Sequence, residues 1–304
     1  MPTDFQLHTP IAFFIYRRPD LTARVFEAIR QVRPSQLLII ADGPHPARPQ
    51  EVQSCETTRE VVRSIDWDCQ VYTDFSPVNL GLAKRISSGL DWVFSQVDQA
   101  IILEDDCLPD PSFFLFCQAL LNHYANDQRI MTISGDNYQF GRCRTAYSYY
   151  FSRYNHCWGW ATWQRAWQHF DFDMSQWPTV RDQGWLWDIL QDRAAVKVWE
   201  TAFQRTFEGI YDTWDYRWTL ACWLRSGLTV LPQVNLVSNI GFGTAGTHLV
   251  RRNIFADLAS GAVTFPLKHP PYVIRDARAD RYTQDVLFSM APINRIRRKF
   301  GIGL

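Results

Sequence analysis

Short apolar runs recur along the first half of the chain, and each is followed by a segment with helical spacing. Residues 11–16 and 37–41 are continuous apolar runs of the kind that form strands buried on both faces. Pro19 stands where a helix between them would start, and apolar residues then recur every three or four positions up to Val32. The pattern predicts a strand, a helix and a second strand at the start of the chain.

The same alternation continues to about residue 133. Helical spacing is found at 51–65, 82–97 and 111–124, and apolar strand-like runs at 69–72, 100–103 and 130–133. Strands that alternate with helices in this way predict an α/β fold with a mostly parallel central sheet and helices on both faces. In such sheets ligands bind beyond the carboxyl ends of the strands.

The second half of the chain is rich in aromatic residues. Eleven of the 13 tryptophans lie between Trp158 and Trp223. Helices are expected at 185–208 and 215–226, with a strand at 228–231. No linker rich in Gly, Pro or Ser separates the halves, so we expect one continuous domain.

Composition excludes several classes of protein. The 304 residues include 31 basic and 31 acidic side chains, and this neutral balance gives no general attraction to nucleic acid. A hydrophobic content of 46% excludes a disordered chain. Seven cysteines without a CxxC pair, and an N-terminus without a leader or span, favour a cytoplasmic protein with free thiols.

Residues 291–304 form a basic tail. It contains Arg295, Arg297, Arg298 and Lys299 with no acidic residue, interleaved with apolar positions. Such a segment is suited to peripheral contact with the anionic inner face of a membrane. The alternative is a solvated chain end.

Three adjacent acids, Glu104, Asp105 and Asp106, directly follow the run at 100–103. Neighbouring carboxylates repel one another unless a cation or hydrogen bonds offset the charge. Mn²⁺ or Mg²⁺ takes oxygen ligands and often shares them with substrate phosphates. The cluster therefore predicts a metal that bridges these acids to a diphosphate. A solvated acidic turn before the helix at Pro111 is the alternative.

Charged residues follow other predicted strands as well. Arg17 and Arg18 are suited to forked hydrogen bonds with a diphosphate, or they form an ordinary surface pair. Asp42 either accepts the imide N–H of a uracil ring or closes the Asp-Gly turn. Lys84 and Arg85 begin a helix after a glycine, where an anion is favoured, or they are a solvated first turn.

The segment 241–246 matches the pattern GxGxxG. The dinucleotide fingerprint requires this loop between a strand and a helix of a βαβ unit, and the prolines that follow exclude that context. A glycine loop near a ligand is the better interpretation. His248 follows it as a candidate metal ligand or phosphate contact.

Several motifs together resemble nucleotide-diphospho-sugar transferases of the GT-A type. More narrowly, the chain resembles bacterial glycosyltransferase-like proteins related to the N-acetylglucosaminyltransferase I family, over roughly residues 11–248. The segments that carry the resemblance are 79–85, 101–110, 133–137, 157–161, 214–218 and 241–248.

The resemblance implies a role for each matched position. Asp106 would bind Mn²⁺, Glu104 and Asp105 would face the ribose and the donor sugar, and Asp42 would contact uracil. An arginine after the first strand would contact the nucleotide, and the resemblance does not distinguish Arg17 from Arg18. The residues expected to bind the sugar nucleotide are Tyr16, Arg17, Arg18, Asp42, Lys84, Arg85, Glu104 and Asp105.

The family inverts the sugar linkage, so one carboxylate must accept the proton of the acceptor hydroxyl. The family's Trp-Asp-Asp-Trp stretch corresponds here to residues 214–218, which hold one acid fewer. Asp215 is the expected base and Asp212 the alternative. The expected acceptor contacts are Asp136, Asn137, Trp158 and Trp160.

Residues 1–140 are accordingly expected to bind the sugar nucleotide and 141–290 to hold the acceptor and the catalytic base. The implied partners are a nucleoside diphosphate sugar, with UDP-sugars favoured, and a glycan or lipid-linked glycan acceptor. Two alternatives remain: a nucleotidyltransferase on a similar sheet, and a catalytically degenerate protein that only binds glycans or sugar nucleotides.

Overall fold

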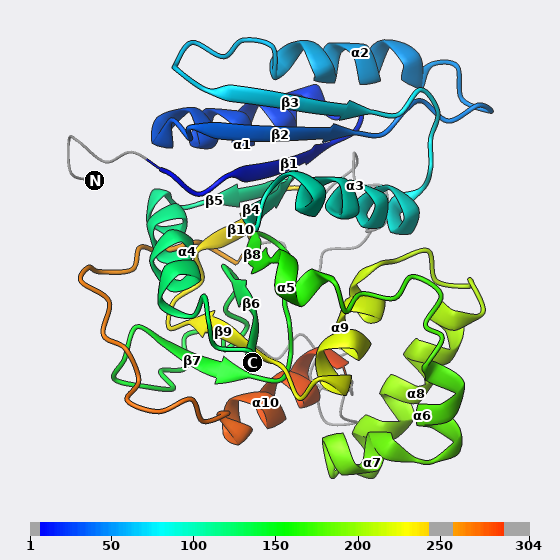
Figure 1. The fold of residues 1–304 in the computed structure, drawn as a ribbon, viewed down its shortest axis with the longest axis vertical. Helices are drawn as coiled ribbons and strands as arrows, with labels where there is room; N and C mark the ends of the chain where they lie inside the picture. The colour runs from blue at the N-terminus through cyan, green and yellow to red at the C-terminus, as the bar shows by residue number, and fades with distance from the viewer. Residues whose placement is uncertain (1–6, 243–257, 289–304) are drawn as a thin grey trace, which may run out of the picture.

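In the part of the chain that the structure describes, eight strands form one sheet (Figure 1). A computed structural model describes residues 7–242 and 258–288. Across the sheet the strands are β3 (Gln70–Phe75), β2 (Gln36–Ala41), β1 (Ile11–Ile15), β4 (Gln99–Glu104), β8 (Trp160–Trp163), β6 (Ile130–Ser134), β9 (Leu228–Pro232) and β7 (Tyr149–Ser152). β1 pairs in parallel with both β2 and β4, whereas β8 and β7 are antiparallel to their neighbours.

Helices cover both faces of this sheet. On one face pack α1 (Pro19–Val32), α2 (Glu51–Val61) and α4 (Pro111–His123), and on the other α3 (Leu82–Gln96), α5 (Gln164–Trp167) and α9 (Asp215–Leu224). Alternate strand residues face opposite layers: Phe13 packs in the first and Phe14 in the second. The predicted α/β class with a mostly parallel sheet is confirmed.

The helices α6 (Trp177–Asp182), α7 (Trp185–Leu190) and α8 (Arg193–Phe207) form a separate aromatic cluster. The prediction of one helix over 185–208 is wrong, because the helix is interrupted between α7 and α8. Gln191 has a left-handed backbone with φ 54°, and the carboxylate of Asp192 accepts hydrogen bonds from the backbone N–H groups of Ala194 and Ala195. Asp192 therefore begins a new helix.

A second, two-stranded sheet lies against the acidic segment. β5 (Cys107–Pro109) pairs antiparallel with β10 (Val237–Asn239), a pairing that the sequence pattern did not predict. The backbone N–H of Ile240 then donates to the carbonyl of Asp106 at 2.8 Å. This pairing places residues 239–242 directly beside the carboxyl end of β4.

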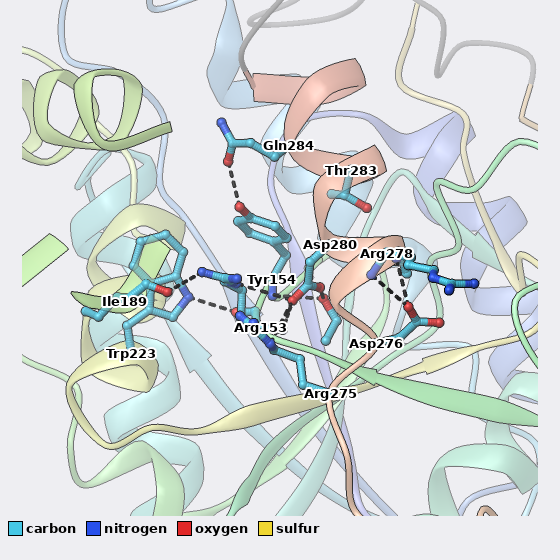
Figure 2. A network of polar contacts seen from close by, with 12 residues as sticks. Arg153, Tyr154, Ile189, Trp223, Arg275, Asp276, Arg278, Asp280, Thr283 and Gln284 are labelled. Carbon is cyan, nitrogen blue, oxygen red and sulfur yellow. Dashed lines mark hydrogen bonds and ion pairs between the residues drawn. The ribbon is translucent and has the colours of Figure 1, made fainter. Parts of the chain in front are cut away.

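Buried charges hold the C-terminal helix α10 (Ala277–Thr283) and its continuation η1 (Gln284–Phe288) against β7 (Figure 2). Asp280 is 2% exposed and accepts a hydrogen bond from Ser152 at 2.6 Å. Arg153 and Arg275 pair with its other oxygen at 3.3 and 3.6 Å. One carboxylate thus joins α10 to the end of β7 and the segment before the helix.

Removing this carboxylate should destabilise the fold. Asp280→Ala removes the carboxylate with which Arg153 and Arg275 pair and leaves their charges uncompensated. We therefore expect the free energy of unfolding to fall by about 3 kcal/mol. Asp276→Ala is the matched control, because Asp276 only caps the start of α10 and its loss should cost about 1 kcal/mol. Urea unfolding measures both, and equal losses would contradict the buried-charge interpretation.

Some predicted features lie outside the described residues. These are His248, residues 243–246 of the glycine segment, and the whole tail at 291–304, together with the tail's expected membrane contact. Among the helices that the structure describes, none combines the length and apolarity required to cross a bilayer.

Candidate functional site

A cleft of about 650 Å³ opens at the carboxyl ends of β1, β2 and β4. This is the edge of the sheet where the sequence pattern placed the ligand. Among the residues that line the cleft are ten predicted site residues: Tyr16, Arg17, Arg18, Asp42, Arg85, Glu104, Asp105, Asp106, Trp158 and Asp212.

The three acids at the end of β4 differ in their surroundings. Asp105 is 2% exposed and is bound by Arg18 and by the backbone N–H of Tyr16. Glu104 is partly buried, and in the described part of the chain no hydrogen bond or ion pair reaches its side chain. Burial, with repulsion from Asp106 and Asp105, raises the pKa of Glu104 to about 8. Without a cation, Glu104 is therefore mostly protonated at neutral pH, and a cation at the cluster would favour its ionised form.

Neutralising Glu104 should stabilise the protein when chelator keeps it free of metal. At pH 8 we expect Glu104→Gln to raise the free energy of unfolding by about 1 kcal/mol or more, because it removes the repulsion and the desolvation of a charge. The folded-state pKa lies above the ordinary value of 4.5, so the wild type loses stability as pH rises from about 4.5 to about 8. The advantage of the variant should therefore vanish at pH 4.5.

Urea titrations at several pH values measure this difference. Glu56→Gln, at an exposed position on α2, is the control and should change stability by less than about 0.5 kcal/mol. An equal effect of both substitutions, or a loss of stability in Glu104→Gln at pH 8, would contradict the prediction.

The two consecutive arginines after β1 point to different partners. Arg18 bonds both Asp105 and Asp106, with 2.8 Å between its Nη1 and Oδ2 of Asp106. Burial opposes its charge, but these two carboxylates outweigh burial and raise the pKa of Arg18. Arg17 instead pairs with Glu51 at 2.8 Å. The sequence alone did not distinguish them.

Glu51, at the start of α2, organises the other side of the cleft. It is 2% exposed and accepts hydrogen bonds from the hydroxyl of Tyr16 at 2.6 Å and the backbone N–H of His45 at 3.2 Å. Arg48 also pairs with it, at 3.3 Å. Burial opposes ionisation, but these donors together lower the pKa of Glu51. One buried carboxylate therefore holds two cationic side chains, Arg17 and Arg48, at the cleft.

Asp42 closes the turn after β2. Its carboxylate accepts from the backbone N–H groups of Gly43 and Leu80, each at 2.9 Å, and from the side-chain amide of Asn79 at 2.9 Å. This is the structural alternative that the sequence left open. Asp42 still lines the cleft at 7% exposure, but its oxygens already have several donors.

Lys84 and Arg85 also separate in the structure. Arg85 lines the cleft but is 6% exposed, and its guanidinium bonds the side chain and the carbonyl of Asp74 at 2.6 and 2.7 Å. Lys84 is exposed on α3 and does not belong to the lining. Arg85 thus ties α3 to β3.

Of the four expected acceptor contacts, one reaches the cleft. Trp158 lines it and meets Phe242 edge to face, with ring centroids 5.5 Å apart. Asp136 is fully buried and accepts from the backbone N–H of Trp158 at 3.0 Å. Asn137 is buried with its amide on the carbonyl of Pro232, and Trp160 is 1% exposed and stacks on Trp214. The structure therefore places the last three in the interior.

The two candidate bases occupy different positions. Asp212 lines the cleft, and its carboxylate accepts from the backbone N–H groups of Leu82 and Ala83 at the start of α3. Asp215 begins α9 and accepts a hydrogen bond from the hydroxyl of Thr213. Burial raises the pKa of Asp215, and its charge also raises that of Glu104. Asp215 is therefore electrostatically close to the acidic cluster, but it is not among the residues that line the cleft.

Twelve further residues line the cleft, among them His45, Arg48, Asn239, Gly241 and Phe242. Of these five, Gly241 and Phe242 belong to the glycine segment that the sequence analysis expected near a ligand. His45 and Arg48 lie in the loop after β2, a position that the strand-end rule covers. Asn239, Gly241 and Phe242 arrive only through the pairing of β10 with β5. Gly241 lies so close to Asp106 that a Cβ there would overlap Oδ2 of the carboxylate.

The acidic cluster suits a hard divalent cation that is shared with a substrate. In residues 7–242 and 258–288, no three His, Cys, Asp or Glu side chains form a complete metal site. Glu104 and Asp106 nevertheless offer carboxylate oxygens at the cleft, and Glu104 has no described partner. Mn²⁺ and Mg²⁺ commonly bind through one or two carboxylates and complete their coordination with phosphate and water. The residues present fit such a metal.

No protein-family model matches this sequence, and no curated protein matches it. Solved structures with a similar fold include a mannosyltransferase from Pyrobaculum calidifontis in complex with GDP-mannose and Mn²⁺, at 14% identity and a TM-score of 0.34. That alignment covers 52% of this chain and 45% of the other, so this chain spans less than half of the mannosyltransferase.

Two more are a 4-diphosphocytidyl-2C-methyl-D-erythritol synthase from Anaerococcus prevotii and a cytidylyltransferase from Leptospira borgpetersenii. Their identities are 6% and 14%, with TM-scores of 0.32 and 0.33. The alignments cover 52% and 57% of this chain and 72% and 68% of the others. Likeness at this level does not assign a family, and none of the three is an N-acetylglucosaminyltransferase, so the narrower resemblance gains no support here.

Proposed function

We propose that this protein is a metal-dependent transferase that moves a sugar from a nucleoside diphosphate sugar to a hydroxyl acceptor. The observation that carries the proposal is the cleft itself. Glu104 and Asp106 stand beside Arg17, Arg18 and Arg48 in one cavity. Acids that hold a divalent cation, next to arginines that bind phosphate, suit a metal-bound diphosphate.

Each side of the cleft has a role in this proposal. Asp106, with Glu104, would hold the cation, which when bound offsets negative charge on the departing diphosphate. Arg17 and Arg48, fixed by Glu51, supply positive charge at the side of the cleft near β2. The resemblance implies that uracil contacts Asp42. The turn that Asp42 closes would then form the wall of the cleft against which the uracil ring lies.

Asp215 is the proposed general base. A base must be ionised yet retain affinity for a proton, and burial raises the pKa of Asp215 in that direction. Both oxygens of Asp212 already accept hydrogen bonds from the start of α3, which makes it the weaker candidate. Trp158 and Phe242 would form the apolar wall for an acceptor sugar, because the apolar faces of sugars stack on aromatic rings.

A thermal-shift and calorimetric titration tests the proposal. UDP, GDP and CDP are each added with Mn²⁺ and with chelator. A ligand at one hundred times its Kd should stabilise the protein by about 2.7 kcal/mol. Stabilisation by one nucleotide that requires Mn²⁺ supports the donor site. No response to any nucleotide contradicts the transferase mechanism.

Turnover separates the remaining alternatives. Release of nucleoside diphosphate from a sugar nucleotide identifies a glycosyltransferase. Release of pyrophosphate from a nucleoside triphosphate and a sugar phosphate would identify a nucleotidyltransferase instead. Metal-dependent binding of sugar nucleotides without any consumption, with water or with glycans as acceptors, would identify a binding protein.

A further inference from the structure

Arg18 pairs with Asp106, a carboxylate that is proposed to hold the metal. Its guanidinium spans Asp105 and Asp106, and it reaches Oδ2 of Asp106 at 2.8 Å. The side chains of Arg18, Asp105 and Asp106 are 18%, 3% and 15% exposed, so little water screens the pair of ion pairs. A guanidinium and a divalent cation cannot share these oxygens without strong repulsion.

The neighbouring arginine shows that this contact is specific. Arg17 has nearly the same place in the chain, yet it turns to Glu51 at 2.8 Å and its guanidinium lies 5.5 Å from the ring centre of Tyr16. Two neighbours fix where Arg18 and its partner lie. Pro19 begins α1 directly after Arg18, and the backbone N–H of Tyr16 donates to the carboxylate of Asp105 at 3.2 Å. Only one of the two arginines therefore meets the acidic cluster.

On the basis of the proposed function, we propose that Arg18 is a resident counter-cation: it neutralises the metal-binding carboxylates in the donor-free protein and transfers to the diphosphate when metal and donor bind together. The exchange leaves neither Asp106 nor the diphosphate without a cationic partner, because the metal would replace the guanidinium at Asp106 and the guanidinium would pair with the diphosphate. A guanidinium suits both partners, since it forms forked hydrogen bonds to carboxylate and to phosphate alike.

Two consequences follow from this exchange. Mn²⁺ alone must displace Arg18 without giving it a new partner, so the wild type should bind Mn²⁺ weakly. A nucleoside diphosphate removes that cost and should strengthen Mn²⁺ binding, and by linkage Mn²⁺ should strengthen nucleotide binding by the same factor. Arg18 would thus keep the affinity of the site for the metal low until the donor binds.

The decisive measurement is the affinity for Mn²⁺ alone, by electron paramagnetic resonance of the free ion. Arg18→Ala and Arg18→Gln should each bind Mn²⁺ about 10- to 100-fold more tightly than the wild type, the equivalent of one or two charge-assisted hydrogen bonds. Their coupling between Mn²⁺ and UDP or GDP should fall by a similar factor. Arg17→Ala is the matched control and should leave the affinity for Mn²⁺ alone within about threefold.

Each result has a separate meaning. Circular dichroism establishes that the variants are folded, and Arg18→Gln keeps a polar side chain should Arg18→Ala unfold. Tighter Mn²⁺ binding in either folded Arg18 variant supports the inference. Unchanged or weaker binding, in a protein whose wild type shows Mn²⁺-dependent nucleotide binding, overturns the inference and leaves the proposed function intact. Absence of Mn²⁺ and nucleotide binding in wild type and variants overturns both.

Discussion

Asp106→Ala is expected to abolish the Mn²⁺-dependent stabilisation by a nucleoside diphosphate. The substitution removes one of the two cleft carboxylates proposed to hold the metal, so we expect the affinity for the metal–nucleotide pair to fall at least about 100-fold. At a ligand concentration of one hundred times the wild-type Kd, nearly all of the gain of about 2.7 kcal/mol is then lost. In the thermal-shift assay this corresponds to a loss of several degrees.

The control for this prediction is Asp110→Ala. Asp110 lies four residues further along and caps α4 through the backbone N–H of Ser112 at 2.8 Å, outside the cleft lining. Its loss should lower stability by about 1 kcal/mol and leave the nucleotide response unchanged. A normal Mn²⁺-dependent response in Asp106→Ala would remove the acidic cluster from the proposed site.

The fold was largely predictable because most strands of the main sheet are buried on both faces, although β3 at its edge is exposed at four of six positions. The five buried positions of β2, Leu37–Ala41, are all apolar, and such a continuous apolar run is typical of a strand covered on both faces. The break between α7 and α8 was not predictable from periodicity, because apolar residues continue on both sides of Gln191 and only the capping by Asp192 interrupts the helix. The strands β5, β7, β8 and β10 are too short for a clear pattern.

The location of the site was also predictable, since charges after buried strands collect at one edge of a parallel sheet. The partners of those charges were not. Arg18 meets Asp106 across 88 residues and Arg17 meets Glu51 across 34, and sequence order carries no record of either choice. Trp160 illustrates the same limit, because its place in the core depends on Trp214 from a distant helix start.

The arginines Arg17, Arg18 and Arg48 of the cleft share one feature: acidic side chains hold each of them in place without a ligand. Glu51 fixes Arg17 and Arg48, and Asp105 with Asp106 fixes Arg18. Side chains held in this way lose less conformational entropy when they bind an anion. Glu104 has no such partner among the described residues, and its raised pKa of about 8 is what a bound cation would lower.

Asp215→Asn is expected to remove turnover while it preserves donor binding. The substitution keeps the shape of the side chain and its contact with Thr213 but cannot accept a proton, so we expect kcat to fall by about 10²- to 10⁴-fold. Release of nucleoside diphosphate with water as the acceptor measures this loss without knowledge of the natural acceptor. The Kd for the metal–nucleotide pair should stay within about threefold of the wild type.

Asp212→Asn distinguishes the two candidates. Asp212 caps the start of α3, so its substitution should cost about 1 kcal/mol of stability and leave most of the turnover. In the wild type, kcat should fall as pH drops through the pKa of Asp215, which burial holds above its ordinary value of 3.8. This acid limb should be absent in Asp215→Asn. If Asp212→Asn loses turnover instead and Asp215→Asn retains it, the base is Asp212, and Asp215 only supports the fold of α9.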